Sequence, residues 1–241
     1  MVHTLPDYTS KWRSDTPTVN LNVSEIARRI NPVSSPDGRG RMRWFDDMQG
    51  LEDGWYYQTV TSGAHSVTTE QPYTGDQAFR LETGVLLNSI QRMSKHLYPG
   101  DNPRQGVECI FANLLNDGSF VMEFSIQNGT ESSLGSLRLD LKNDIIYFNP
   151  TWAGVFHNIA AHPFRPASLA YLTVKLVMDF ETKMWVRAIV DGIEYDLSAW
   201  EATPVIAATG YRTLITLAAE NIDAEVCRFN VGAVFLTDQE P

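Results

Sequence analysis

The sequence has only two cysteines among its 241 residues, Cys109 and Cys227, and it has no CxxC spacing. This scarcity argues against a disulfide-rich scaffold and against a cysteine-based zinc site. Both cysteines lie in strand-like apolar runs, at residues 107–111 and 224–229. We interpret them as buried thiols that pack as small hydrophobic groups, and a disulfide between them is the alternative.

Positive charge is also scarce, because 19 Lys and Arg residues face 29 Asp and Glu residues, for a formal net charge of −10. A nucleic-acid binder needs a basic face for the phosphates, and anionic membranes attract basic segments. The charge therefore argues against both partners. Neutral ligands such as sugars stay compatible, since their recognition depends little on net charge.

Long apolar runs are absent, and none approaches the roughly 20 residues that a membrane-spanning helix needs. The first residues lack the basic, apolar and small-residue order of a secretory signal, so we expect a cytoplasmic protein. The sequence also has no glycine-rich phosphate loop, no G-x-S-x-G motif and no dinucleotide fingerprint. No sequence motif therefore points to a nucleotide or dinucleotide cofactor.

The clearest positive signal is alternation of apolar and polar residues with a period of two, which half-buried strands require. Residues 171–179 and 184–190 show it best, with a short turn between them and the hairpin signal Asp191-Gly192 after them. One face is expected to carry Leu172, Val174, Leu176, Met178, Met184, Val186, Ala188 and Val190. The opposite face is expected to carry Thr173, Lys175, Asp179, Trp185 and Arg187.

The same pattern predicts strands along most of the chain after Met42. Further strands are expected at 55–60, 64–69, 78–82, 106–113, 120–127, 136–142, 145–149, 195–200, 211–219 and 225–237. The first two of these, and the pair 106–113 and 120–127, are expected to form hairpins because turn sequences with glycine separate them. About a dozen short strands predict an all-β fold, a two-sheet antiparallel jelly-roll sandwich.

One segment has conflicting signals. Leu86, Ile90, Met93 and Leu97 have helical spacing. Because strands surround it on both sides, we favour a strand over residues 87–95.

Residues 1–40 differ from the rest in being rich in Ser, Thr, Pro and Asn. Ser24 suits the cap of a short helix that contains Ile26 and Ile30 and ends at Asn31-Pro32. We therefore expect an extended N-terminal arm with one small helix at 1–40 and a single β-sandwich at 41–241. An arm of this kind packs on the main body or on a neighbouring subunit, so a homo-oligomer is left open.

Three segments resemble the concanavalin A-like lectin/glucanase superfamily. Residues 44–47 (WFDD) are similar to its opening strand, and residues 72–81 to a turn followed by a strand that ends in Arg-Leu. Residues 173–192 resemble the laminin-G-like passage from a Val-Lys-Leu strand through an acidic turn to Val-Asp-Gly. The resemblance spans about residues 42–237 and concerns strands and turns, so it implies the fold and only loosely a function.

Outward-facing polar side chains of the long strands form the first candidate site. Alternation leaves Glu123 outward if its apolar neighbours face the core, and it places five further residues outward, namely Arg138, Asp140, Lys175, Trp185 and Arg187. In a sandwich of this kind one sheet is concave, and a Trp beside charged groups suits a sugar. The alternative is a solvated sheet face with weak cross-strand ion pairs.

Glycoside hydrolysis requires two carboxylates, one on each side of the scissile bond. Glucanases of the resembled family typically carry Glu-x-Asp-x-x-Glu or a similar acidic trio on one strand, and this sequence has no such trio. Glu123 and Asp140 are lone acids on their strands, and Glu108 is a candidate partner for Glu123. We therefore favour a protein without catalysis. A hydrolase or lyase that uses Glu123 with Glu108 or Asp140 is the alternative.

The aromatic-rich loop at residues 149–164 is a second candidate. Trp152 and Phe156 are interpreted as anchors over a sheet edge, and a cap over a ligand is the alternative. His157 and His162 are five residues apart, which does not fit a helical pair of metal ligands.

Calcium is the other ion to consider, since lectin-like sandwiches often hold one through carboxylate and backbone oxygens. The candidate ligands are Asp46, Asp47 and Asp238, near the start and the end of the expected domain.

The sequence thus favours a carbohydrate-binding β-sandwich without a catalytic signature. Its candidate ligand-binding residues are Glu123, Arg138, Trp152, Lys175, Trp185 and Arg187. The alternatives are a glycoside hydrolase or lyase of the same fold, and a structural protein that oligomerises through its N-terminal arm.

Overall fold

The computed structural model describes residues 37–241 except 50–53, 71, 74–75, 99, 101, 116–117, 152–154, 165–170, 203–204, 207–209 and 222. Most of the expected N-terminal arm, with its helix, lies outside these residues. The homo-oligomer built through this arm therefore stays a prediction. The first strand begins at Arg41.

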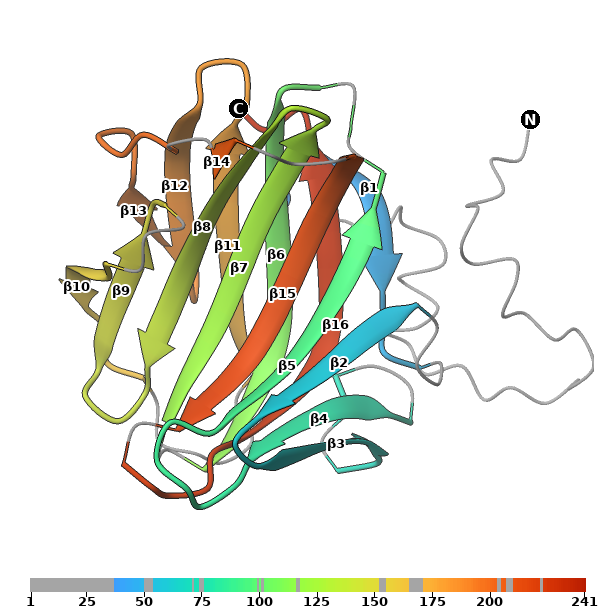
Figure 1. Ribbon diagram of the computed structural model, residues 1–241, viewed down its shortest axis with the longest axis vertical. Coiled ribbons are helices and arrows are strands. Elements are labelled where there is room, and N and C mark those ends of the chain that lie inside the picture. The colour runs from blue at the N-terminus through green and yellow to red at the C-terminus, as the bar shows by residue number, and fades with distance from the viewer. Residues whose placement is uncertain are drawn as a thin grey trace, which may run out of the picture.

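Two antiparallel sheets packed face to face form the described part of the chain, which contains strands and no α-helix (Figure 1). Sheet A has the order β13-β12-β11-β6-β16-β4-β3, with β1 also paired to β16. Sheet B has the order β10-β9-β8-β7-β15-β5-β2, with β14 also paired to β8. The predicted all-β, two-sheet antiparallel sandwich is confirmed.

Each sheet contains eight strands in the described part of the chain. Sheet A consists of β1 (Arg41–Asp46), β3 (Gly63–Thr68), β4 (Ala78–Thr83), β6 (Arg104–Leu115), β11 (Tyr171–Asp179), β12 (Met184–Val190), β13 (Ile193–Asp196) and β16 (Arg228–Asp238). Sheet B consists of β2 (Trp55–Val60), β5 (Ile90–Leu97), β7 (Gly118–Asn128), β8 (Glu131–Asp140), β9 (Ile145–Asn149), β10 (His157–Ala161), β14 (Val205–Ile206) and β15 (Tyr211–Asn221).

Two of the predicted hairpins are wrong. Strands β2 and β3 belong to different sheets, and so do β6 and β7. A turn sequence determines where a chain reverses, but it does not determine whether the next strand pairs in the same sheet or crosses to the other. By contrast, β11–β12, β12–β13 and β8–β9 pair as predicted. Asp191 and Gly192 have positive φ angles of 52° and 79°, as a tight hairpin turn needs.

The core is an apolar layer between the two sheets. Phe111 of β6 stacks on Phe120 of β7 with ring centroids 3.9 Å apart, and Phe229 of β16 packs edge-on against both rings. The core-facing residues predicted for 171–179 all lie in this layer. Strand β5 confirms the strand interpretation of the ambiguous segment, and Met93 is part of the core. Both cysteines are buried and free, as favoured.

Trp185 corrects the predicted alternation of residues 184–190. Between β11 and β12 the register shifts at Val186, so that Val177 pairs with Arg187 and Met178 with Trp185. This β-bulge inverts the alternation, and Trp185 faces the core with none of its surface exposed. Its ring packs edge-on against Phe148, 5.3 Å between centroids, and its indole N–H donates to the Pro150 carbonyl over 3.1 Å.

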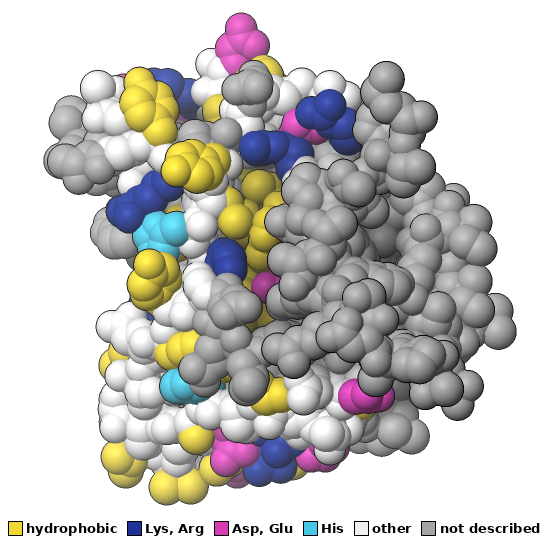
Figure 2. Space-filling model, turned by 90° about the vertical axis from the view of Figure 1, so that its right-hand side faces the viewer, with side chains coloured by type: hydrophobic (Ala, Val, Ile, Leu, Met, Phe, Trp, Pro, Cys, Tyr) yellow, Lys and Arg dark blue, Asp and Glu magenta, His cyan; other side chains and the backbone are white. Residues whose placement is uncertain are grey.

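No described helix is long and apolar enough to cross a membrane. Figure 2 shows one side of the sandwich, on which acidic, basic and hydrophobic side chains are interspersed over the described surface. On that side, the excess negative charge of the sequence is not gathered in one patch.

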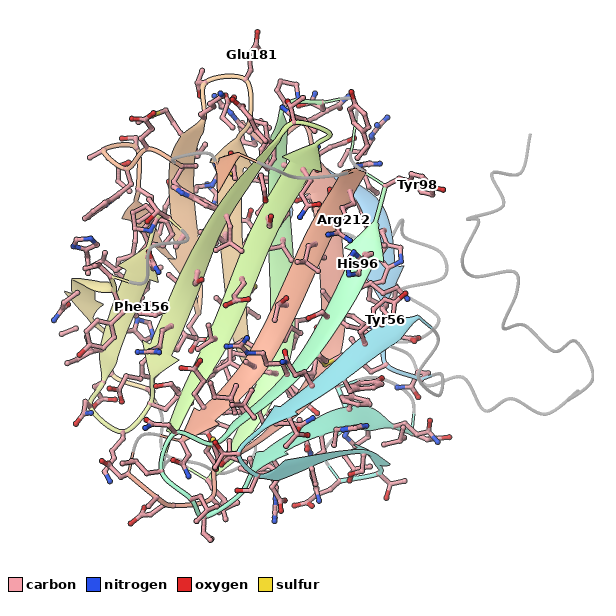
Figure 3. All side chains as sticks on the ribbon, in the orientation of Figure 1. Tyr56, His96, Tyr98, Phe156, Glu181 and Arg212 are labelled. Atoms are coloured by element: carbon pink, nitrogen blue, oxygen red, sulfur yellow. The ribbon has the colours of Figure 1, made fainter. Side chains whose placement is uncertain are left out.

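Replacing Trp185 by alanine tests the inward orientation. Trp185→Ala leaves a cavity in the core, and we expect the free energy of unfolding to fall by about 3–5 kcal/mol. Urea unfolding followed by circular dichroism measures it. The matched control is Tyr98→Ala, because Tyr98 is 87% exposed (Figure 3) and its loss should change stability by less than about 0.5 kcal/mol. Equal stability of the two variants would contradict the buried position.

Candidate functional site

The outer face of sheet B carries two aligned rows of side chains, because residues opposite each other in antiparallel strands point to the same face. The first row, which we call the polar row, consists of Tyr56, Ser94, Thr216, Glu123, Ser136 and Asn149. The adjacent row, which we call the arginine row, consists of Gln58, Arg92, Ala218, Val121, Arg138 and Tyr147. The two rows cross six strands, from β2 to β9.

Small side chains occupy the middle of these rows and long ones surround them. Val121 and Ala218 lie side by side in the arginine row and are 2% and 1% exposed. Arg92 flanks them on β5 and Arg138 on β8. Short side chains between long ones form a floor, so a ligand placed here meets charged groups at its sides.

Glu123 lies next to this floor, in the polar row. Its neighbours across the strands are hydroxyl side chains, Thr216 on β15 and Ser136 on β8. Among the described residues, the Glu123 carboxylate has no hydrogen-bond partner, and the charges that act on it are those of Arg92 and Glu220. Burial raises the pKa of Glu123, and the nearby charge of Arg92 opposes this shift.

Arg138 is held by groups from two other segments. Its guanidinium donates to the Glu220 carboxylate of β15 over 2.6 Å, and the ring of Phe156 stacks on it at 4.0 Å. Phe156 precedes β10, so this segment reaches the outer face of sheet B at the side of β9 (Figure 3). A charged group fixed by an ion pair and a ring is positioned for recognition with little loss of side-chain freedom.

The opposite side of the face carries Tyr56, His96 and Arg212 (Figure 3). Tyr56 is 65% exposed, and its ring meets that of His96 edge-on at 5.3 Å. Arg212 contacts His96 Nδ1 over 3.1 Å and donates to Gln127 over 2.6 Å. An exposed ring with polar neighbours at this side is a surface on which a sugar can stack.

Lys175 and Arg187 do not lie on this face, which corrects their predicted grouping with Glu123. Both belong to sheet A, where Lys175 Nζ is 2.8 Å from carboxylate oxygens of Asp37 and Glu240. Arg187 donates to Glu240 and to the Pro241 carbonyl, each over 2.7 Å. Lys175 is 1% exposed, so its charge is buried within the cluster, beside a small pocket that Asp37, Glu108 and Lys175 help to line. Alternation predicts that a residue faces outward, but not which sheet it faces outward from.

Neither predicted acidic partner meets Glu123. Glu108 lies on sheet A, 1% exposed, with its carboxylate 3.9 Å from Lys175. Asp140 shares the outer face of sheet B but pairs with Ser119, four residues from Glu123 along β7, or roughly 13 Å. Both carboxylate oxygens of Asp140 accept hydrogen bonds from Asn143 in the following turn. Glu220 is the carboxylate whose charge acts on Glu123, and it forms an ion pair with Arg138.

The three calcium candidates do not converge. Asp238 pairs with Arg41 at one end of β1, whereas Asp46 lies at the other end. Asp238 accepts two hydrogen bonds from Arg41, and Asp46 accepts the indole N–H of Trp55. Asp47 accepts the backbone N–H of Gln49. Within the described residues, no group of three acidic, His or Cys side chains is arranged to hold a metal ion.

The segment at 149–164 is partly a strand rather than one long loop, because β10 pairs with β9 at the edge of sheet B. The His157 ring packs on Trp200 at 4.4 Å, and His162 Nδ1 is 2.7 Å from the Tyr195 hydroxyl. The two histidines therefore have separate partners. Trp152 lies outside the described residues, so its role stays a prediction.

Sequence reasoning missed several residues of the face, above all Arg92 and Glu220. The period-two pattern places both on the polar side of predicted strands. Arg92 was hidden by the helical spacing of its neighbours, and Glu220 lies one residue beyond the predicted end of its strand at 219. Only the register between β5, β15 and β7 places them on the same outer face as Glu123, where their charges act on it.

Comparisons with known proteins agree at the level of the fold. No family model and no curated protein matches the sequence. Among solved structures, an endo-beta-1,4-glucuronan lyase from the fungus Trichoderma reesei superposes with a TM-score of 0.55 at 11% identity, over 82% of this chain and 96% of that one. The chain has the concanavalin A-like β-sandwich fold. Cip1, a cellulose induced protein, gives a TM-score of 0.57 at 10% identity, over 82% of this chain and 98% of the other. At such identities the likeness shows the fold alone.

The pKa of Glu123 predicts a dependence of stability on pH. Because this pKa is raised in the folded state, the folded protein holds the proton more tightly than the unfolded chain, whose reference value is 4.5. This contribution is complete below that value and is lost as pH rises through the folded pKa. Glu123→Gln has no proton to lose, so we expect it to gain stability relative to the original protein between acid and neutral pH. Urea unfolding over that pH range measures the difference.

The control for this prediction is Glu181→Gln, since Glu181 is an exposed residue of the β11–β12 turn (Figure 3). This variant measures what the same change does to stability at an exposed position. A difference between Glu123→Gln and the original protein that stays constant with pH would show that the folded environment does not raise the pKa of Glu123.

The buried cluster on sheet A predicts a large effect of removing Lys175. Lys175→Met leaves the carboxylates of Asp37 and Glu240 without this cation, and we expect a loss of about 3–5 kcal/mol in the free energy of unfolding. The matched control is Lys183→Met, because Lys183 forms a half-exposed ion pair with Glu131 at 2.7 Å. That pair should contribute less than about 1 kcal/mol. Denaturant unfolding measures the loss for both variants. Equal losses in the free energy of unfolding would contradict the prediction.

Proposed function

We propose that the protein binds carbohydrate on the outer face of sheet B, at the polar row and the arginine row. The observation that carries the proposal is Glu123, a half-buried carboxylate without a hydrogen-bond partner among the described residues. Partial burial disfavours its charge, and a ligand hydroxyl that donates to it supplies a hydrogen bond to that charge. Such unpaired groups are common at binding sites.

The rest of the polar row supports a sugar as the ligand. Its hydroxyl and carboxamide side chains donate and accept hydrogen bonds, as sugar hydroxyls do. Aromatic rings stand at both sides of the face, Phe156 beside Arg138 and Tyr56 beside His96. Rings stack on the C–H faces of sugars while polar groups between them set orientation.

The fold adds support by analogy. One of the two solved structures named above is a lyase that acts on glucuronan, a polysaccharide. A shared fold at this identity permits a shared ligand class but does not demonstrate it. The proposal therefore depends on the residues of the face.

A catalytic role for the same face is the second candidate, and the raised pKa of Glu123 favours it, because general acids need their proton near neutral pH. Its second acid would be Glu220, whose charge acts on Glu123. However, the register places Glu220 opposite Ser119, four residues from Glu123 along β7, or roughly 13 Å, whereas the two carboxyl groups of a glycosidase lie about 5–9.5 Å apart. We therefore favour binding without catalysis.

A glycan array probed with the purified protein tests the proposal. We expect binding to at least one polysaccharide or oligosaccharide, and a loss of about tenfold or more in affinity for Glu123→Gln, because the amide cannot replace a charged acceptor. The matched control is Glu82→Gln on sheet A, where Glu82 pairs with Arg228 at the other face of the sandwich. Its affinity should equal that of the original protein.

Two outcomes would contradict this function. The first is no binding to any glycan by a protein that is folded by circular dichroism. The second is binding that Glu123→Gln and Phe156→Ala both leave unchanged. Release of shortened sugars from a bound polysaccharide, lost in Glu123→Gln, would instead establish the catalytic candidate.

A further inference from the structure

Two arginines face each other across the floor of the proposed site. Arg92 and Arg138 occupy the same row, separated by Ala218 and Val121. Three strand spacings separate their backbones, or roughly 14 Å. Arginine side chains are long enough to reach toward one another over that distance. The two small residues between them are 2% and 1% exposed, so the longer side chains around them cover the floor.

The two guanidinium groups differ in what already holds them. Arg138 uses one amino group on Glu220 and presents its face to Phe156, which leaves other donors for a ligand. Arg92 makes no hydrogen bond or ion pair with any described residue, although it is half-buried. The Nε–H groups of both are buried without a partner within the described part of the chain. Half-buried guanidinium groups with spare donors are an incomplete anion site.

Four charged residues, two of each sign, lie around the floor. Arg92, Arg138, Glu123 and Glu220 balance formally, but the Glu123 carboxyl is the one whose proton is held more tightly, because burial disfavours its charge. Whenever Glu123 carries its proton, these four residues have a net charge of +1. This contrasts with a chain whose net charge is −10. The arginines are therefore not part of a general basic surface.

A neutral sugar offers the spare donors of the two guanidinium groups only neutral acceptors. A carboxylate on the sugar offers a charged acceptor, and its two oxygens match the planar fork of a guanidinium. Hydrogen bonds between charged groups are about twice as strong as those between neutral ones.

We propose that the ligand is an acidic polysaccharide, whose uronic-acid carboxylate binds between Arg92 and Arg138 above Val121 and Ala218. This inference rests on the proposed function and narrows its ligand class. Tyr56 and Phe156 then contact the sugar rings on either side of that carboxylate, and Glu123 receives a hydroxyl of the same chain.

The test compares sugars that differ only in the carboxylate. Isothermal titration measures the affinity for oligomers of glucuronate, galacturonate and mannuronate and for the glucose, galactose and mannose oligomers of the same linkage and length. We expect at least one acidic oligomer to bind about tenfold or more tightly than its neutral counterpart. The preference should shrink as salt is added, because screening weakens charged contacts at a partly open site.

Variants then locate the carboxylate. Arg92→Met should reduce affinity for the acidic oligomer by about 10- to 100-fold and leave the neutral one nearly unchanged. Arg92→Lys keeps the charge but loses the planar fork of the guanidinium. Its affinity for the acidic oligomer should lie between those of the original protein and Arg92→Met. The matched control is Arg228→Met, which removes a guanidinium from sheet A, where it pairs with Glu82. Thermal unfolding temperatures of Arg92→Met and Arg92→Lys that equal that of the original protein exclude a folding defect as the cause.

The outcomes separate this inference from the proposed function. Neutral oligomers that bind as tightly as acidic ones, with Glu123→Gln weakening both, would overturn the acidic ligand class and keep carbohydrate binding. An acidic preference that Arg92→Met leaves intact would overturn the placement of the carboxylate. Binding of neither kind of oligomer would overturn both proposals.

Discussion

The apolar layer between the two sheets is the constraint on which the other features depend. Once Phe111, Phe120 and Phe229 meet between the sheets, every second residue of each long strand must face that layer. The remaining residues face outward, and the pairing register determines which of them become neighbours. The polar row and the arginine row are therefore consequences of core packing, although none of their residues belongs to the core cluster.

The outer faces of the two sheets differ in how their charged side chains are paired. On sheet A, residues 37–40 and the last residues of the chain contact Lys175 and Arg187 and bury their charges in closed ion pairs. On sheet B, Arg92 and Glu123 have no hydrogen-bond partner among the described residues. The buried ion pairs of sheet A contribute mainly to a unique arrangement of the chain. The unpaired groups of sheet B can still form hydrogen bonds with another molecule.

Period-two alternation was sufficient to predict the fold class, most strands and the outward position of Glu123 and Arg138, because each depends on a few neighbouring residues. It failed for Trp185, where one extra residue at Val186 inverts the alternation and burial of a large ring outweighs the local pattern. It also failed to distinguish the sheets, and so grouped Glu108 and Lys175 with Glu123. Which strand crosses to the other layer depends on contacts between residues far apart in the chain, and no local pattern encodes them. The placement of Arg92 and Glu220 on the same face as Glu123 has the same origin.

The position of the last two long strands has a consequence for how the molecule is made. Strand β15 lies between β7 and β5 in the middle of sheet B, and β16 lies between β6 and β4 in the middle of sheet A. Each sheet is therefore two separate halves until residues beyond 210 have left the ribosome. The edges of the N-terminal strands therefore stay unpaired during most of synthesis, and unpaired edges are prone to aggregation. Folding is then a late event, in which the insertion of two strands completes both sheets and the binding face together.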